Sequence, residues 1–96
     1  MHPEYVHIGL GNVLFINRVI AIVPPDSAPV KRSIKNAKVN DKLIDMTSGR
    51  RTRAVIFTES DHIILAALAP ETIIGRIQAI RGGIVIKPEV VEKEKK

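Results

Sequence analysis

Residues 13–42 constrain the fold more than any other part of the chain, because two kinds of element meet there at a double proline. Val13–Val23 is an apolar, β-branched run that only one Asn-Arg pair interrupts. Such a run predicts one long strand, buried on much of both faces. Pro24 and Pro25 end it, since proline cannot continue a ladder of backbone hydrogen bonds.

A helix is expected to begin directly after the prolines. Asp26 and Ser27 can both supply an N-cap oxygen, and Pro29 is tolerated in a first helical turn. Apolar side chains then follow at spacings of four and three and form one stripe: Val30, Ile34 and Ala37. A basic stripe lies roughly 100° around the same helix: Lys31, Lys35, Lys38 and Lys42. The pattern predicts one apolar and one basic face.

Shorter elements flank this unit. Strands are predicted at 5–10, 43–46, 54–57 and 62–68, with turns at 9–12, 47–49 and 59–61. Pro70 and Glu71 open a second helix that runs to about Ala79. The fold class is therefore α+β, a mainly antiparallel sheet of about five strands with two helices.

The 96 residues fit a single α+β domain, which we place at 1–80. Residues 81–96 are expected to be a partly disordered extension, in which 84–86 could form an edge strand. The chain has no cysteine, which excludes disulfides, thiolate metal sites and cysteine catalysis. No signal peptide and no apolar run of roughly 20 residues is visible. We therefore expect a cytoplasmic protein without a membrane partner.

The positive charge is concentrated in the middle of the chain. The net charge is +5, but residues 18–53 hold nine bases and three acids, whereas the rest holds six bases and seven acids. Concentrated like charges repel one another, and a polyanion is the common partner that relieves this repulsion.

The segment Ser48–Arg53 is the strongest candidate binding site. Arg50, Arg51 and Arg53 follow a glycine that allows a tight turn, and each guanidinium can grip two phosphate oxygens. The alternative is a charged strand edge that discourages aggregation. The lysine stripe could equally be a solvated helix face; Lys31, Arg32 and Lys35 gain weight as candidates because they belong to the same basic segment.

Arg18 interrupts an apolar run, so its charge must emerge at an edge, face a partner or pair with an acid. A buried ion pair with Asp45 is the alternative to a role in binding. The residues alone are compatible with both interpretations of Arg18, a role in binding and an ion pair.

No catalytic or metal-binding pattern stands out. The Gly-Leu-Gly-Asn sequence at 9–12 lacks the third glycine of a nucleotide loop, and Ser60, Asp61 and His62 are neighbours in a turn rather than a triad. His2 and His7 show no ligand spacing with His62. We expect no enzyme activity, cofactor or metal. Only three aromatic residues exist, none among the bases, which favours duplex over single-stranded nucleic acid.

These segments together resemble the RemA family of small bacterial DNA-binding regulators of extracellular-matrix genes. The resemblance spans about three-quarters of the chain, from 7 to about 77. The matching segments are HIGLGN at 7–12, NRVIAIV at 17–23, DSAPVKR at 26–32, LID at 43–45, GRRTRAVI at 49–56, SDHIIL at 60–65 and PET at 70–72. Residues 79–96 are an unmatched extension, and Met46 and Ser48 depart from the family's usual loop.

The resemblance implies a nucleoid-associated transcription regulator of matrix and osmoprotection genes. It also implies a ring-shaped homo-oligomer around which DNA bends, with Pro29 in a structural role. By position it implies DNA contacts from Arg18, Arg32, Arg50, Arg51 and Arg53. Two alternatives remain: an RNA-binding protein with the same basic face, and a phosphate-ligand sensor or enzyme built on the loop 48–53.

Overall fold

The structure, a computed structural model, describes residues 4–80. The two expectations for the C-terminal extension, an edge strand at 84–86 and a disordered tail, lie outside these residues. Within them the fold is α+β, with two α-helices and six strands in two sheets. The expected α+β class with two helices and mainly antiparallel strands is confirmed; the structure has six strands in two sheets, where about five strands in one sheet were expected.

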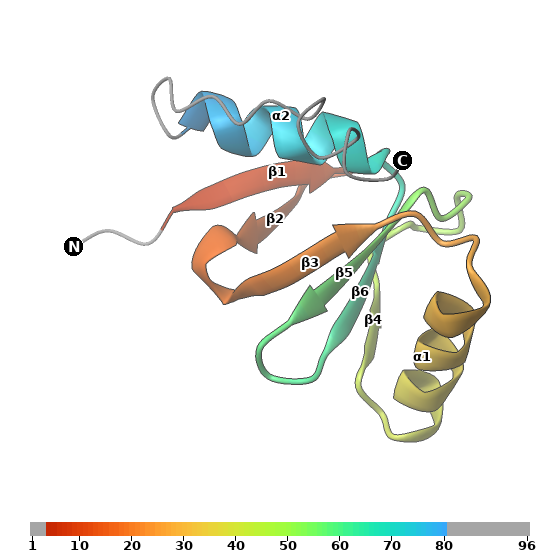
Figure 1. The fold of residues 1–96 in the computed structure, drawn as a ribbon. Helices are drawn as coiled ribbons and strands as arrows, with labels where there is room; N and C mark the ends of the chain where they lie inside the picture. Colours follow the sequence, from red (N-terminus) through yellow and green to blue (C-terminus); the bar gives the residue numbers. More distant parts are fainter. Residues whose placement is uncertain (1–3, 81–96) are drawn as a thin grey trace, which may run out of the picture.

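A four-stranded sheet forms the centre of the fold (Figure 1). Its strand order is β3 (Val19–Val23), β5 (Ala54–Thr58), β6 (Ile63–Ala66) and β4 (Leu43–Asp45). The β3–β5 and β5–β6 pairs are antiparallel, and β4 runs parallel to β6. The central strands β5 and β6 are buried almost throughout, as their continuous apolar sequence requires.

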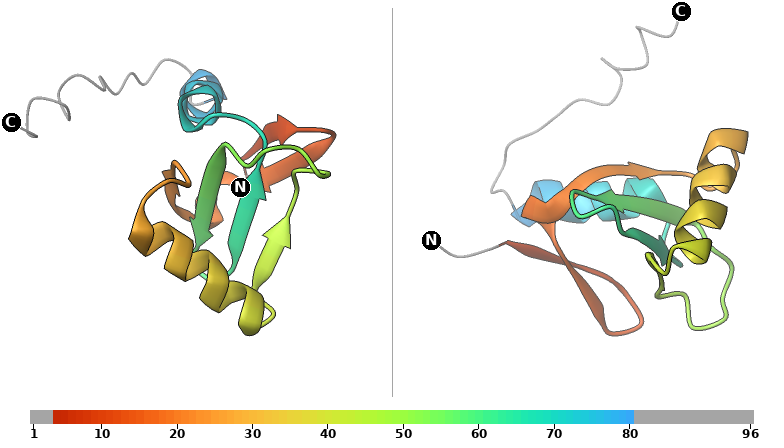
Figure 2. Two further views of the ribbon diagram at one scale, coloured as in Figure 1. Left: turned by 90° about the vertical axis from the view of Figure 1, so that its right-hand side faces the viewer. Right: turned by 90° about the horizontal axis from the view of Figure 1, so that it is seen from below.

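The two faces of this sheet are covered by different elements (Figure 2). Helix α1 (Ala28–Val39) packs on one face, where it meets alternate side chains of β5 and β6 such as Val55 and Leu65. The hairpin of β1 (Tyr5–Gly9) and β2 (Asn12–Phe15), together with α2 (Pro70–Ile80), covers the other face, around Ile56 and Ile64. Successive side chains of each central strand point to opposite faces of the sheet, so β5 and β6 contribute to both hydrophobic cores.

Helix α1 begins where the sequence predicts. The Val30 amide donates to the Ser27 hydroxyl oxygen at 3.3 Å, and Pro29 lies in the first turn. The helix ends earlier than the basic stripe implies, because Asp41 adopts a left-handed φ of 61° and the Lys42 amide donates to the Ala37 carbonyl at 2.7 Å. This is the hydrogen-bonding pattern of a Schellman ending. Lys42 therefore lies beyond the helix, and its expected place in the stripe is wrong.

The long strand expected over 13–23 is divided into two. A 3₁₀ turn, η1 (Ile16–Arg18), separates β2 from β3, and the two strands belong to different sheets. Ile16 is buried while Asn17 and Arg18 are exposed, so the chain turns at its one polar interruption. Ile20 is 68% exposed, which also contradicts burial on both faces.

Candidate nucleic-acid interface

The arginine segment opens with a tight turn. Ser48 and Gly49 have φ of 53° and 82°, and the Arg50 amide donates to the Thr47 carbonyl at 3.0 Å. Left-handed φ at both central positions is typical of a type I′ turn, which glycine favours. The turn expected at 47–49 is confirmed, and Arg50 is its last residue, directly after the tip formed by Ser48 and Gly49.

A carboxylate holds the start of this turn. Asp45 Oδ1 accepts hydrogen bonds from the Thr47 hydroxyl at 2.6 Å and from the Thr47 amide at 2.9 Å. The hydroxyl bond first, and the amide bond second, lower the pKa of Asp45 because they favour its charged form. The stabilisation is present above the ordinary carboxyl pKa and is lost as the pH falls through the lowered value.

The three arginines of the segment point outward. Arg50, Arg51 and Arg53 are exposed, and within residues 4–80 none of their guanidinium groups makes an ion pair or a hydrogen bond. Among residues 4–80, they and Ala67 line a hollow of about 580 Å³. Their charge is thus available to an anion from solvent.

Both helices begin beside these arginines. Arg51 and Arg53 also line a smaller hollow of about 190 Å³ with the segments 24–26 and 69–71, which lead into α1 and α2 (Figure 1). Helix N-termini carry partial positive charge and favour anions. Asp26 and Glu71 lie in the same hollow and offset part of this charge. Sequence patterns alone did not predict that α2 begins beside the arginines, because the position of α2 depends on the packing of the core that it shares with the β1–β2 hairpin.

The candidate bases of α1 lie at increasing distance from the arginine turn. Lys31 and Arg32 are exposed in the first turns of the helix, a few residues after the segment 24–26 that lines the smaller hollow, and Lys35 is exposed about one turn further on. We call Arg50, Arg51, Arg53, Lys31 and Arg32 the arginine end of the molecule. Lys38, close to the last turn of α1, lies toward the other end.

Arg18 lies at the opposite end of the sheet. It precedes β3, whereas Val23 at the other end of β3 pairs with Val55, so about 16 Å of strand separates it from the arginine turn. Its Nε lies 2.8 Å from Glu59 Oε2, and both side chains are more than half exposed. One chain therefore does not bring Arg18 together with Arg50, Arg51 and Arg53.

The partner considered for Arg18 in the sequence is wrong. Asp45 bonds to Thr47, and Glu59 takes the ion pair with Arg18. The antiparallel register explains the choice, since Val19 lies opposite Thr58 and the Glu59 amide donates to the Arg18 carbonyl at 3.0 Å. An exposed pair of this kind contributes little to stability.

The described residues contain no group of three potential metal ligands and no helix able to span a membrane. Fold and site together define a small α+β protein whose outward-facing arginines gather at one end, where both helices begin. A family model described as extracellular matrix regulatory protein A-like (RemA-like) matches residues 5–77. The chain belongs to this family of regulatory proteins.

Relatives in several bacteria agree with this assignment. The chain is 63% identical over 92 residues to a protein of Dehalococcoides mccartyi strain BAV1, which covers 96% of this chain and 95% of the relative. It is 54% identical over 79 residues to a protein of Thermoanaerobacter sp. strain X514, covering 82% of each. A Synechococcus sp. strain JA-3-3Ab protein is 48% identical over 89 residues, 93% of this chain and all of the relative. All three are named "Putative regulatory protein".

Proposed function

We propose that this protein regulates transcription by binding duplex DNA through its arginine end. The observation that carries the proposal is that the side chains of Arg50, Arg51 and Arg53 are exposed together and that their guanidinium groups have no partner within residues 4–80. A guanidinium keeps its charge at any physiological pH and binds phosphate oxygens in pairs. Phosphate contacts of this type give DNA affinity, while preference among sequences comes from DNA shape and bendability.

The positions of the described aromatic side chains favour the binding of duplex DNA over the binding of a single strand. Tyr5 and Phe15 are exposed, but they pair with each other at the open end of the β1–β2 hairpin. They lie far from the arginine turn, which adjoins the closed end of the hairpin through Asn12. Single-strand platforms place aromatic side chains among the bases for stacking, and the arginine end has none.

A competition titration tests the choice of nucleic acid. A fluorescent DNA duplex bound to the protein is challenged with an unlabelled duplex, with single-stranded DNA and with single-stranded RNA of the same sequence. We expect the duplex to compete best, because its phosphates are closely spaced and regular. Stronger competition by single-stranded RNA would favour an RNA-binding protein instead.

A phosphate-ligand sensor or enzyme finds less support at this site. Within residues 4–80, the hollow beside the arginine turn is lined by three arginines and Ala67, so the described part of the chain offers no carboxylate or imidazole there to act as an acid or base. The acids of the neighbouring hollow, Asp26 and Glu71, would repel a phosphate. An outward arginine surface suits a polyanion that lies across it.

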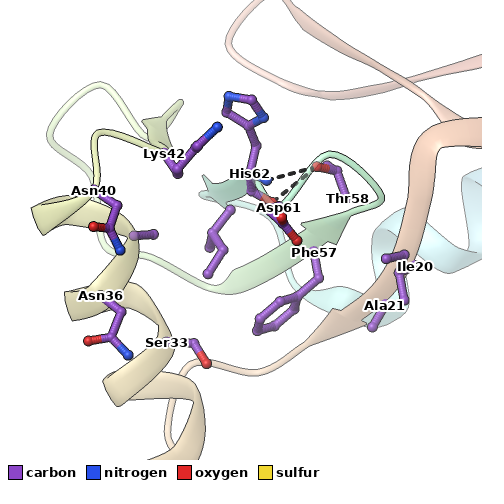
Figure 3. A pocket seen from close by; sticks show the side chains of 12 residues that line it. Ile20, Ala21, Ser33, Asn36, Asn40, Lys42, Phe57, Thr58, Asp61 and His62 are labelled. Carbon is purple, nitrogen blue, oxygen red and sulfur yellow. Dashed lines mark hydrogen bonds between the residues drawn. The ribbon is translucent and has the colours of Figure 1, made fainter.

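We also propose that the protein acts as a homo-oligomer, as the ring of the family implies. A single chain offers few phosphate contacts, and repeating the arginine end raises the effective concentration of each contact. Apolar side chains lie exposed away from the arginine end. Ile20 and Phe57 line an open groove of about 770 Å³ between α1 and the free edge of β3 (Figure 3). A free, apolar strand edge is a common site of self-association.

Ile20→Glu is expected to reduce self-association. The charge would be desolvated in a subunit contact along β3, so the mass in solution, measured by light scattering, should fall toward the monomer mass of 10.6 kDa. Val39→Glu is the matched control, because Val39 is equally apolar and exposed but lies outside the groove. Wild-type protein that is already monomeric would contradict the proposed oligomer, and equal masses for Ile20→Glu and wild type would exclude this edge as its contact.

A further inference from the structure

The loop that presents the arginines is tied to an element remote in the sequence. Residues 46–53 connect β4 to β5. The Met46 amide donates to the Leu65 carbonyl at 2.9 Å, and the Arg53 amide donates to the Ala66 carbonyl at 2.8 Å. Both ends of the loop are thus held by β6. The Thr47–Arg50 turn lies between these anchors and projects from the sheet.

Asn12 bridges the base of this turn, at Met46, and the β1–β2 hairpin. Its Nδ2 donates to the Met46 carbonyl at 3.3 Å and to the Gly9 carbonyl at 3.2 Å. An amide NH₂ group has two hydrogens and can serve two carbonyls at once. The side chain is half-buried, so solvent replaces these bonds poorly.

The hairpin itself is held firmly where Asn12 leaves it. Gly9 has a φ of 101°, and a Cβ at this position would lie 3.3 Å from Leu68 Cγ. Behind the hairpin turn, Val6, Ile8 and Leu14 are buried in the core. A bond from Asn12 therefore joins the arginine loop to a well-packed support.

We propose that Asn12 is a positioning residue for DNA binding: its amide links the β1–β2 turn to the Met46 carbonyl, directly before the Thr47–Arg50 turn, and so helps to set the place of Arg50. The inference rests on the proposed function of the arginine end. A loop that is already ordered before binding loses less conformational entropy when it meets the phosphates. Arg53 depends on Asn12 much less, because the ladder bond to Ala66 fixes its backbone.

Asn12→Ala is the first test, and Asn17→Ala is the matched control. Asn17 is an exposed asparagine on η1, so its loss should leave binding unchanged. We expect Asn12→Ala to weaken duplex binding about fivefold, the value of one typical hydrogen bond. If Asn12→Ala does not fold, Asn12→Ser, which keeps a short polar side chain but cannot reach both carbonyls, takes its place.

A double-mutant cycle separates positioning from general loss of structure. Arg50→Ala should cost more than tenfold in the wild type but only about twofold in the Asn12→Ala background, because a displaced Arg50 already binds poorly. Arg53→Ala should cost the same in both backgrounds. Additive effects of Asn12→Ala and Arg50→Ala would overturn the inference.

Hydrogen exchange gives a readout that needs no DNA. The Arg50 amide bonds to Thr47, and it should exchange faster in Asn12→Ala while the amides of β5 keep their wild-type protection. Unchanged exchange at Arg50 would contradict the positioning role. If Arg50→Ala and Arg51→Ala both bind like the wild type, the proposed function fails; if they lose affinity and Asn12→Ala does not, only this inference fails.

Discussion

Arg50→Ala and Arg51→Ala are each expected to weaken duplex binding more than tenfold without changing the fold. Both side chains are exposed and make no ion pair or hydrogen bond within residues 4–80, so their removal costs the folded chain little. Each charged hydrogen bond to phosphate is worth about 1.5–3 kcal/mol, and an oligomer loses it in every subunit. Fluorescence anisotropy with a labelled duplex measures the affinity.

Lys38→Ala is the control for these variants. It removes one positive charge from the exposed surface of α1, but near the end of the helix that points away from the arginine end. Its affinity should fall only slightly. Equal losses for Lys38→Ala and Arg50→Ala would indicate attraction to the net charge of the chain rather than a site, and wild-type affinity in both arginine variants would refute the site.

Ile73→Ala is expected to destabilise the protein by about 3 kcal/mol, since a fully buried isoleucine leaves a cavity when truncated. Ile73 is 0% exposed and is the buried residue through which α2 enters the core of β1, β2 and the central sheet. In a domain of this size such a loss lowers the melting temperature by roughly 12–24 °C. Thermal unfolding followed by circular dichroism measures it.

The neighbouring residue provides a matched control. Ile74 is 40% exposed on the outer side of α2, so Ile74→Ala removes the same atoms and changes helix propensity equally. We expect a change below about 1 kcal/mol. A similar destabilisation by the two substitutions would mean that α2 does not pack as described.

Local signals in the sequence were sufficient to predict much of the fold. The Ser27 cap with Pro29 located the start of α1, and the turn residues located the 9–12, 47–49 and 59–61 connections. These features depend on contacts within a few residues, which sequence patterns report directly. The start of α2 at Pro70 was predicted for the same reason.

The incorrect predictions concern features that tertiary packing determines. The apolar pattern of 13–23 suits two short strands as well as one long one, and only the separate β1–β2 sheet requires the break at Ile16–Arg18. The 3.6-residue spacing predicted that Lys42 belongs to the helix. This spacing carries no information about the left-handed backbone of Asp41, which ends the helix. Hydrophobic period cannot distinguish these cases.

The candidate site was predicted in part. The arginine turn follows from its own sequence, and its glycine adopts the expected left-handed φ. The neighbouring helix starts, the Asn12 bridge and the Arg18–Glu59 pair join residues far apart in the chain. Such contacts depend on strand register and on the packing of α2, which no short pattern in the sequence specifies.

The resulting molecule has two different ends. Arginines and both helix starts lie at one, and the open groove beside Ile20 and the edge of β3 extend toward the other.

The salt dependence of duplex binding tests the central claim most directly. Each phosphate neutralised by an arginine or lysine contributes about −0.9 to the slope of log K against log salt. Three arginines in one subunit predict a slope of about −3, and further subunits in contact make it steeper. A slope near zero for the wild-type protein would contradict binding through phosphates, and with it the role of the arginine end.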